Sequence, residues 1–354
     1  MSMNSKFAAI LEDIENALSK ALPQKAEEKW IRESFGSLPK AVKADHFDNL
    51  IEANKSLIEL GGKRWRPLLM ILCYEMAAEK TKKPLLSKQQ LYSLTPLVEF
   101  VHTASLIHDD IEDGADLRRG KPAAYISYGT DTAINAASWL YFEAPVCINQ
   151  SDISAEDKLE FYKTYTQELR KLHLGQAMDI YWHRNPSVFP SEEEYLAMVK
   201  NKTGTLASLA AKTGGLAGGL SREEAEELGD TAAKIGMGFQ IIDDVINLTT
   251  GNPGKKCGDD IVEGKKSLPV IMHSQAHPED KKAISKYMEA AAKEGINSPS
   301  VDSCIQLLKK YGFIDQAAEK GILLIKENSA KLHSKDIQEL FISMVPSNFL
   351  GKNE

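Results

Sequence analysis

Two acidic clusters are the residues of this chain best suited to chemistry. The first is Asp109-Asp110-Ile111-Glu112-Asp113, and the second, Asp243-Asp244, lies about 130 residues further on. Residues four apart share a helix face, so Asp109 and Asp113 would project together, as would Asp243 and Asn247. Magnesium takes oxygen ligands and keeps several waters, so two such clusters would suit a diphosphate bound through magnesium. The near absence of thiol and imidazole ligands argues against zinc.

Acidic pairs also occur on ordinary solvated helix faces, because 50 of the 354 residues are acidic. Here each cluster follows a mostly apolar segment, residues 97–107 and 235–242. In the first segment apolar residues recur at helical spacing. Carboxylates at the end of a buried helix are unfavourable unless they are paired or bound to metal. The basic pair Arg118-Arg119 follows the first cluster closely, which favours a site for a polyanion over a solvated face.

Composition excludes several classes of protein. A chain of 354 residues with 43% hydrophobic and 26% charged residues is typical of a globular protein with a large core. The net charge of −7, without a long Lys/Arg run, argues against nucleic acid as a partner. Four cysteines without a C-x-x-C pair indicate free thiols in a reducing compartment. No segment reaches the roughly 18 apolar residues of a membrane span, and the N-terminus is acidic, so we expect a cytoplasmic protein without an integral membrane segment.

Helical periodicity between Pro and Gly breaks predicts an all-α fold, since strand-like alternation is nearly absent. No low-complexity linker interrupts the pattern, so we expect a single domain over residues 1–354. The glycine-rich segment 214–219 lacks the G-K-[ST] ending of a phosphate loop and is expected to turn one helix into the next. The expected helices are 4–21, 42–60, 66–80, 88–111, 131–146, 155–181, 192–215, 222–248 and several shorter ones from 279 to 345.

Seven segments, in order, resemble the motifs of trans-isoprenyl diphosphate synthases of the polyprenyl synthetase family, most closely the eukaryotic-type geranylgeranyl diphosphate synthases. They are GGKRWRP, HTASLIHDDIEDGADLRRGKPA, YGTDTAINAASWLYF, LHLGQAMDIYW, NKTGTL, GFQIIDDVINL and KKCGDDIVEGKKSLP, between residues 61 and 269. The resemblance implies an isoprenoid synthase-type helical bundle around a central cavity, with the two acidic clusters facing each other near its mouth. It also implies a homodimer.

The resemblance implies a head-to-tail condensation. An allylic diphosphate (dimethylallyl, geranyl or farnesyl) loses its diphosphate, the double bond of isopentenyl diphosphate attacks the allylic cation, and a proton leaves. Diphosphate leaves readily only when its charge is neutralised, a task for about three magnesium ions. The implied metal ligands are Asp109, Asp110, Asp113 and Asp243, although Asp110 and Asp244 also suit an orienting role. Asn247 replaces a third carboxylate, and its amide oxygen would bind magnesium more weakly.

The family's other site positions fall on basic and polar residues of this chain. By resemblance, the isopentenyl diphosphate site comprises Gly62, Lys63, Arg66, His102 and Arg119. The allylic diphosphate site comprises Arg118, Lys202, Lys256 and Lys265, with Thr203 and Gln240 beside the reacting carbons. The implied catalytic set is Asp109, Asp113, Lys202, Thr203, Gln240 and Asp243. Outside these motifs a lysine would be read as solvated and His102 as a core histidine.

Product length depends on the depth of the cavity. In the family, bulky aromatics four and five residues before the first aspartate close the cavity early, whereas here these positions hold Ser105 and Ala104. The resemblance places the floor at the bulky segment Trp139-Leu140-Tyr141-Phe142, although aromatics at helical spacing are more often plain core. We therefore expect a C20 product and predict that small residues at Tyr141 or Phe142 lengthen it.

Three alternatives to a C20 synthase stay open. A longer-chain polyprenyl diphosphate synthase would use the same chemistry with a deeper cavity. A terpene cyclase or diphosphate lyase on the same fold would keep the acidic clusters but would not need Lys63, Arg66, His102 and Arg119. A noncatalytic subunit that tunes another synthase would be expected to lose the acidic clusters, and this chain keeps them.

Overall fold

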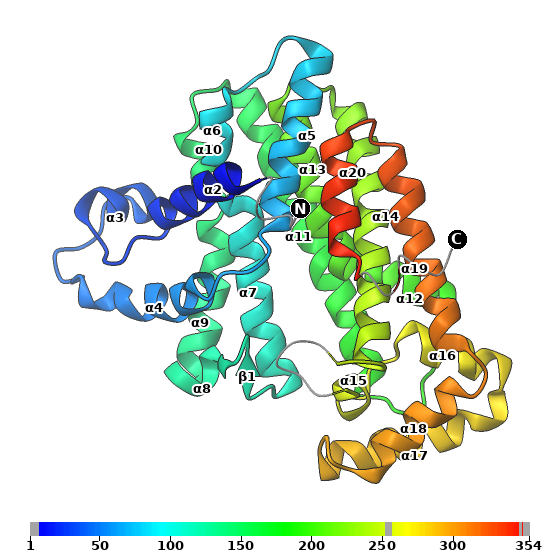
Figure 1. Cartoon of the computed structure of the whole chain (residues 1–354). Coiled ribbons are helices and arrows are strands. Elements are labelled where there is room, and N and C mark those ends of the chain that lie inside the picture. The colour runs from blue at the N-terminus through cyan, green and yellow to red at the C-terminus, as the bar shows by residue number, and fades with distance from the viewer. Residues whose placement is uncertain (1–6, 252–256, 347–348, 350–354) are drawn as a thin grey trace. The chain divides into compact units, whose positions relative to one another are not determined.

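The computed structural model describes residues 7–251, 257–346 and 349, which fold almost entirely into helices (Figure 1). The prediction of an all-α fold is confirmed. The helices are α2 (Ala8–Ala21), α3 (Glu28–Phe35), α4 (Asp45–Glu59), α5 (Trp65–Thr81), α6 (Lys88–Tyr92), α7 (Pro96–Asp113), α8 (Ala124–Tyr128), α9 (Thr130–Glu143), α10 (Val146–Gln150), α11 (Ala155–His183), α12 (Glu192–Val199), α13 (Thr205–Ala217), α14 (Arg222–Asn247), α15 (Asp259–Val262), α16 (Leu268–Ala276), α17 (Lys281–Glu294), α18 (Pro299–Lys309), α19 (Phe313–Ala330) and α20 (Lys335–Met344).

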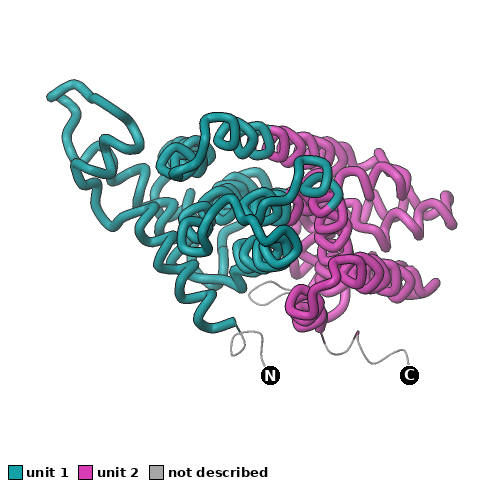
Figure 2. Tube along the Cα trace, turned by 90° about the horizontal axis from the view of Figure 1, so that it is seen from above, with its two compact units in different colours: residues 1–166, 209–227 teal, residues 167–208, 228–354 magenta. Residues whose placement is uncertain are grey.

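The chain divides into two compact units, drawn teal and magenta in Figure 2. Unit 1 comprises residues 1–166 and 209–227, and unit 2 comprises residues 167–208 and 228–354. Among the described residues, no helix combines the length and the apolar character that crossing a membrane requires.

Several expected helices are interrupted where local chemistry demands it. The segment expected to be one helix over 88–111 is two helices, α6 and α7, because Pro96 has no N–H and begins a new helix. The segment 192–215 contains a π-helical turn, Lys200–Gly204, between α12 and α13. The helices α3, α8, α15 and α16 were not predicted, nor was α10 beyond its first residue. The two-residue strands β1 (Leu117–Arg118) and β2 (Lys121–Pro122), which form an antiparallel hairpin, were not predicted either.

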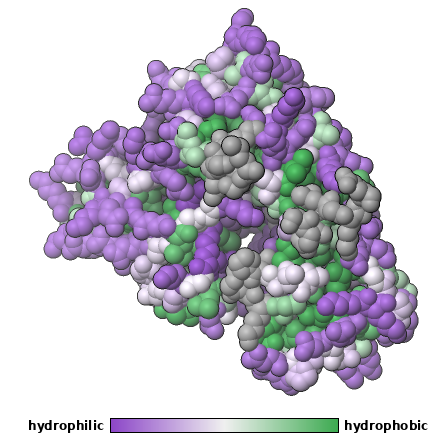
Figure 3. Space-filling view, in the orientation of Figure 1, coloured by the Kyte–Doolittle hydropathy of each residue, from purple (hydrophilic) through white to green (hydrophobic). Residues whose placement is uncertain are grey.

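Unit 1 is built around α4, α5, α7 and α9. Helix α9 packs against both α4 and α7, and Asn54 Nδ2 of α4 donates to Ala136 O of α9 at 2.8 Å. The face of α3 and α4 that is visible at the left of Figure 3 is mainly hydrophilic. Trp30 of α3 and Phe47 of α4 are both buried.

The glycine-rich segment 214–219 brings two backbones together within unit 1. Gly214 lies in α13, where a Cβ atom would be 2.2 Å from Met70 O of α5. A Cβ atom added at Gly218 would be 2.5 Å from the Cβ of Ala77. The expected turn is found at Gly218 and Gly219, whereas Gly214 and Gly215 are helical, in agreement with the helix expected over 192–215. These glycines permit close helix packing rather than phosphate binding.

Close backbone approaches also shape unit 2. A Cβ at Gly175 of α11 would lie 2.3 Å from Lys202 N, and one at Gly204 would lie 2.8 Å from Ala233 O of α14. Further along α14, a Cβ at Gly238 would be 2.6 Å from Gly321 O of α19. The π-helical turn is therefore held between two helices that approach it at van der Waals distance.

Buried Glu143, at the end of α9, contacts α3 and gives a prediction about pH. Burial raises the pKa of Glu143 to about 7, and the 2.7 Å hydrogen bond donated by Ser34 Oγ opposes this only in part. The ordinary value is 4.5, so the protonated carboxyl stabilises the fold fully below about pH 4.5 and this contribution is lost as the pH rises through about 7. The unfolding free energy of Glu143→Gln minus that of wild type should therefore be about 2 kcal/mol larger at pH 8 than at pH 5. Denaturant unfolding at both pH values measures this, with the exposed Glu52→Gln as control; a pH-independent difference would contradict it.

Candidate active site

The hairpin that follows α7 directs two neighbouring arginines to different places. Arg119 and Gly120 form its two-residue turn, and both have positive φ angles, 53° and 76°. Such a turn matches the twist of the flanking strands. Arg118, the last residue of β1, contacts the acidic cluster, whereas Arg119, in the turn, contacts the loop before α5.

Arg118 is held against the first acidic cluster. Its Nε donates to Asp110 Oδ1 at 2.8 Å, its Nη2 also bonds this oxygen, and Nη2 lies 3.6 Å from Asp109 Oδ2. Burial opposes the charge of Arg118, but the hydrogen bond and negative charge of Asp110 outweigh it and raise the pKa of Arg118. The side chain of Asp110 is 1% exposed and that of Asp109 is 21% exposed. Asp110 therefore orients Arg118, whereas Asp109 is accessible to a ligand.

The carboxylates at the end of α7 fit a bound cation. The helix ends at Asp113 with Gly114 in the left-handed conformation, so Asp109 and Asp113 lie at the negative end of the helix dipole, where anions are disfavoured. An all-oxygen donor set suits magnesium. Within the described part of the chain, no group of three or more His, Cys, Asp or Glu side chains is already arranged to hold a metal ion.

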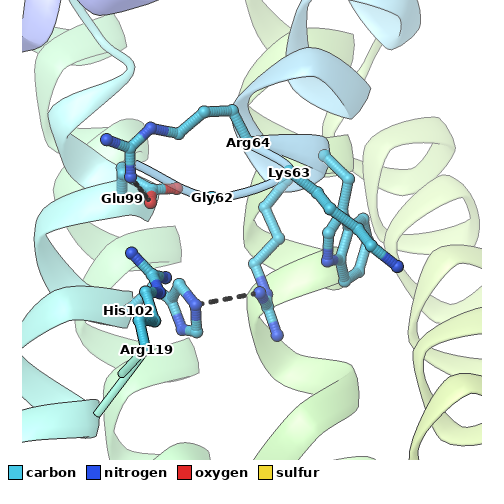
Figure 4. A pocket seen from close by; sticks show the side chains of 8 residues that line it. Gly62, Lys63, Arg64, Glu99, His102 and Arg119 are labelled. Carbon is cyan, nitrogen blue, oxygen red and sulfur yellow. Dashed lines mark hydrogen bonds and ion pairs between the residues drawn. The ribbon is translucent and has the colours of Figure 1, made fainter. Parts of the chain in front are cut away.

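A cationic pocket lies where the loop before α5 meets α7 and the hairpin, all within unit 1 (Figure 4). Its volume is about 170 Å³, and it is lined by Gly62, Lys63, Arg64, Trp65, Arg66, Glu99, His102 and Arg119. The structure thus brings together all five residues predicted for the isopentenyl diphosphate site. Arg64, Trp65 and Glu99 were not predicted, although Glu99 precedes His102 by one helical turn.

Burial adjusts the charges in this cationic pocket. It lowers the pKa of Arg66 to about 10, with Glu99 opposing the shift, so Arg66 stays charged at neutral pH. Burial, followed by the charge of Arg66, lowers the pKa of His102 well below its ordinary value. Arg66 Nη1 lies 3.3 Å from His102 Nε2, so the neutral imidazole accepts a hydrogen bond there. The pocket offers arginine donors in a partly dry setting, which suits a phosphate group.

The glycines before α5 leave room for Arg119. Gly62 has a φ of 156°, and a Cβ there would lie 3.1 Å from Arg119 Nη2. Arg119 Nη1 donates to Gly61 O and, at 3.4 Å, to Leu57 O. A Cβ at Gly62 would therefore require the Arg119 guanidinium to shift by a few tenths of an ångström.

In unit 2, a hydrogen-bonded chain links the π-helical turn to α14. Thr203 Oγ1 donates to Gln240 Oε1 at 2.8 Å, and Gln240 Nε2 donates to Asp244 Oδ1 at 3.0 Å. Tyr195, which the sequence reasoning missed, donates to Asp244 Oδ2 at 2.6 Å. Burial raises the pKa of Asp244 to about 6 despite these two donors. Asp244 therefore orients Gln240, and neighbouring Asp243 is exposed.

Two of the lysines predicted for the allylic diphosphate are paired with acidic side chains. Lys202 Nζ lies 2.6 Å from Asp179 Oδ2, a partner that the sequence reasoning missed although it lies within the LHLGQAMDIYW segment. Lys265 forms an ion pair with Glu263. Lys256 lies outside the described residues.

Asn247 does not have the free amide oxygen that its sequence position implied. Its Oδ1 accepts the backbone N–H of Asp260 at 3.2 Å, and its carbonyl accepts that of Gly258 at 2.8 Å. Asn247 is 2% exposed. In this arrangement Asn247 supports the start of α15, so the idea that its amide could replace a metal ligand is not supported.

The segment expected to form the cavity floor points in several directions. Tyr141 is buried and stacks on His108 of α7, with ring centroids 5.6 Å apart, whereas Phe142 is 78% exposed. Trp139 stacks on Phe35 of α3. Successive helical residues differ by about 100° in direction, so they cannot all face one cavity. The prediction of an interior position was therefore wrong for Phe142 in the single chain.

Ala104 and Ser105, the small residues before the first acidic cluster, lie on α7, the helix that also carries His108. Ala104 is fully buried, and its carbonyl oxygen lies 3.1 Å from Nδ1 of His108, the residue that stacks on Tyr141. Ser105 Oγ donates to His102 O at 2.8 Å. Neither residue adds a bulky side chain to α7.

Comparison with known proteins identifies the class to which this fold and site belong. Residues 48–307 match the family model for polyprenyl synthetase. The chain is 32% identical over 287 residues to the geranylgeranyl diphosphate synthase of Methanosarcina mazei, covering 80% of this chain and 83% of that protein. It is 40% identical over 193 residues to a geranylgeranyl pyrophosphate synthase of Apiospora sacchari, covering 54% and 55%. A geranylgeranyl pyrophosphate synthetase structure from Pyrococcus horikoshii OT3 superposes with a TM-score of 0.79 at 28% identity, covering 97% of this chain and 98% of the other. The chain belongs to the polyprenyl synthetase family.

Proposed function

We propose that the protein is a prenyltransferase that condenses isopentenyl diphosphate with dimethylallyl, geranyl or farnesyl diphosphate to give geranylgeranyl diphosphate. The cationic pocket carries this proposal, because its lining of arginines, a lysine and a histidine offers an anion site apart from the carboxylates of Asp109 and Asp113. The names of the relatives support both the reaction and the C20 product.

In this proposal, each diphosphate meets its own set of donors. Lys63, Arg66 and Arg119 bind isopentenyl diphosphate in the cationic pocket, with neutral His102 able to reorient as a donor. Arg118, oriented by Asp110, and Lys202, oriented by Asp179, bind the allylic diphosphate. Prenyl diphosphate synthases are generally magnesium-dependent, and about three ions held through Asp109, Asp113 and Asp243 would supply positive charge to the leaving group.

The polar chain of unit 2 suits stabilisation of an allylic cation. Thr203 and Gln240 carry oxygen lone pairs, and Gln240 is oriented by its hydrogen bonds with Thr203 and Asp244, the latter held in turn by Tyr195. Fixed dipoles of this kind stabilise developing charge without reorganisation. The released diphosphate is the strongest base close to the product cation, and we propose that it accepts the departing proton.

The cationic pocket also weighs against the alternatives. A terpene cyclase would have no second diphosphate to bind, and the arginines that line this pocket would then be an unexplained concentration of positive charge. A longer-chain synthase would need open space between α7 and α9 for the growing chain, whereas here Tyr141 of α9 stacks on His108 of α7.

Tyr141 gives a prediction about product length. Tyr141→Ala should shift the main product beyond C20, because it removes the buried ring stacked on His108. Phe142→Ala was expected from sequence to do the same, but the 78% exposure of Phe142 predicts an unchanged product length. Mass spectrometry of products from both variants measures the effect. An unchanged C20 product from Tyr141→Ala would contradict the assignment of Tyr141 as the floor.

We also propose a homodimer in a cytoplasmic location. On α9, Phe142 is 78% exposed and Ile134 is 44% exposed, and apolar side chains on one helix are often covered by a second copy. All four cysteines are free, as in a reducing compartment. Light scattering of the purified protein should give twice the chain mass, and Phe142→Glu should lower it.

A product assay tests the proposed function directly. Purified protein is incubated with magnesium, isopentenyl diphosphate and one of dimethylallyl, geranyl or farnesyl diphosphate, and the products are identified by mass spectrometry. A dominant C20 diphosphate is the expected result. A longer diphosphate would retain the chemistry and refute the chain-length assignment, whereas a hydrocarbon product would refute the transferase.

A further inference from the structure

The N-terminal helix α2 reaches the cationic pocket through a buried arginine. Arg64, at the start of α5, is 4% exposed, and its Nε donates to Glu15 Oε1 of α2 at 2.7 Å. Its Nη1 donates to Glu99 Oε1 at 2.6 Å, and its Nη2 donates to Ile58 O at 2.5 Å. Figure 4 shows the Arg64 side chain meeting Glu99, which lies on the same helix as His102.

Arg64 also occupies a strained backbone conformation. Its φ of 45° and ψ of 28° are left-handed, a region that costs a non-glycine residue about 1 kcal/mol or more. Arg64 lies between Lys63 and Trp65, so its conformation sets how the chain passes from the loop into α5. The bonds to Glu15, Glu99 and Ile58 hold this conformation within a segment whose Lys63 and Arg66 both line the pocket.

We infer that Glu15 and Glu99 are positioning residues that act through Arg64 to shape the diphosphate pocket, so that α2 is part of the substrate-binding apparatus. Glu15 does not line the pocket, whereas Glu99 does. The role in substrate binding rests on the proposed function, but the effect on anion binding does not. Helix α2 is anchored independently by buried Ile14 and Leu18, so a change at Glu15 should leave it in place.

Electrostatics and positioning make opposite predictions for Glu15→Gln. Removal of a negative charge near a cationic pocket would tighten the binding of an anion if charge alone mattered. If Glu15 positions Arg64, the same substitution weakens binding. The side chain of Glu15 is 49% exposed, so a two- to fivefold loss, about what a partly exposed ion pair provides, is expected.

Calorimetric titration with inorganic pyrophosphate, in the presence of EDTA, tests the inference. Without metal the acidic clusters repel the anion, so the titration reports on the cationic pocket. Glu15→Gln should raise the Kd, whereas Glu12→Gln, an exposed carboxylate three residues away on the same helix, should not. An unchanged or lowered Kd for Glu15→Gln, or an equal rise for Glu12→Gln, would overturn the inference.

A double-mutant comparison shows whether Glu15 acts through Arg64. In Arg64→Gln, adding Glu15→Gln should have no further effect on the Kd; a repeated loss would mean that Glu15 acts by another route. In turnover assays Glu15→Gln should raise the KM for isopentenyl diphosphate and leave kcat and the allylic KM unchanged. Wild-type protein that binds pyrophosphate but forms no prenyl product would refute the proposed function and leave the positioning role standing.

Discussion

Asparagine at Asp109 is expected to lower kcat by about a thousandfold or more. The substitution removes a carboxylate proposed to hold magnesium, and magnesium supplies the positive charge that neutralises the leaving diphosphate. Asp109 is partly exposed at the C-terminal end of α7, where its carboxylate faces the dipole unfavourably. The substitution therefore removes an anion that the isolated helix does not favour. The thermal unfolding midpoint should accordingly stay close to that of wild type or rise, while activity is lost.

The measurement is kcat at saturating concentrations of both diphosphates and magnesium, with a thermal melt of each variant. Asp116→Asn serves as the matched control, since Asp116 is an exposed carboxylate just beyond the same helix. It should retain activity within about twofold, as expected for a surface change. Activity of Asp109→Asn within tenfold of wild type would show that the first acidic cluster does not hold the catalytic charge.

The helical architecture could be predicted from sequence because most helices have apolar residues at helical spacing and end at recognisable residues. Helix α11, expected at 155–181, is found at Ala155–His183, and α14, expected at 222–248, is found at Arg222–Asn247. The π-helical turn at Lys200–Gly204 could not be predicted, because an extra residue in a helical turn leaves the polarity pattern almost unchanged. Its position follows from the glycine contacts at Gly175 and Gly204, which only the folded chain brings together.

The residues of the cationic pocket could be predicted because they lie in short motifs with fixed spacing. The partners that orient them could not. Glu15 is 49 residues from Arg64, and Tyr195 is also 49 residues from Asp244. Nothing in their local sequence distinguishes them from surface carboxylates or core aromatics. A buried ion pair or hydrogen bond is defined by its partner, so it becomes visible only in the fold.

Phe142 shows a different limit of sequence reasoning. Its place in a family motif indicates importance, but the direction of a side chain depends on the phase of the helix. Tyr141 and Phe142 are neighbours in sequence, yet one is buried against His108 and the other is 78% exposed. A motif match therefore identifies the segment, and the structure is needed to say which residue faces the cavity.

Valine at Gly214 is expected to lower the free energy of unfolding by about 4 kcal/mol or more, among the largest effects of a single substitution. A Cβ there would lie 2.2 Å from Met70 O and 3.0 Å from Tyr74 N. Both contacts are with the backbone of α5, which cannot move aside as a flexible side chain would. To relieve these clashes α5 and α13 would have to move apart, although Gly218, just after α13, also lies close to α5.

Denaturant unfolding of Gly214→Val and of Ala292→Val measures this cost. Ala292 is exposed on α17, so valine there should cost only the difference in helix propensity, about 0.5 kcal/mol. Because Arg64 directly precedes α5 and Arg66 lies in its first turn, separation of the two helices should also weaken pyrophosphate binding in the cationic pocket. A Gly214→Val protein with stability and binding close to those of wild type would mean that the two backbones do not approach each other as described. Loss of stability together with binding would show that glycines on α13 maintain a diphosphate site to which they contribute no side chain.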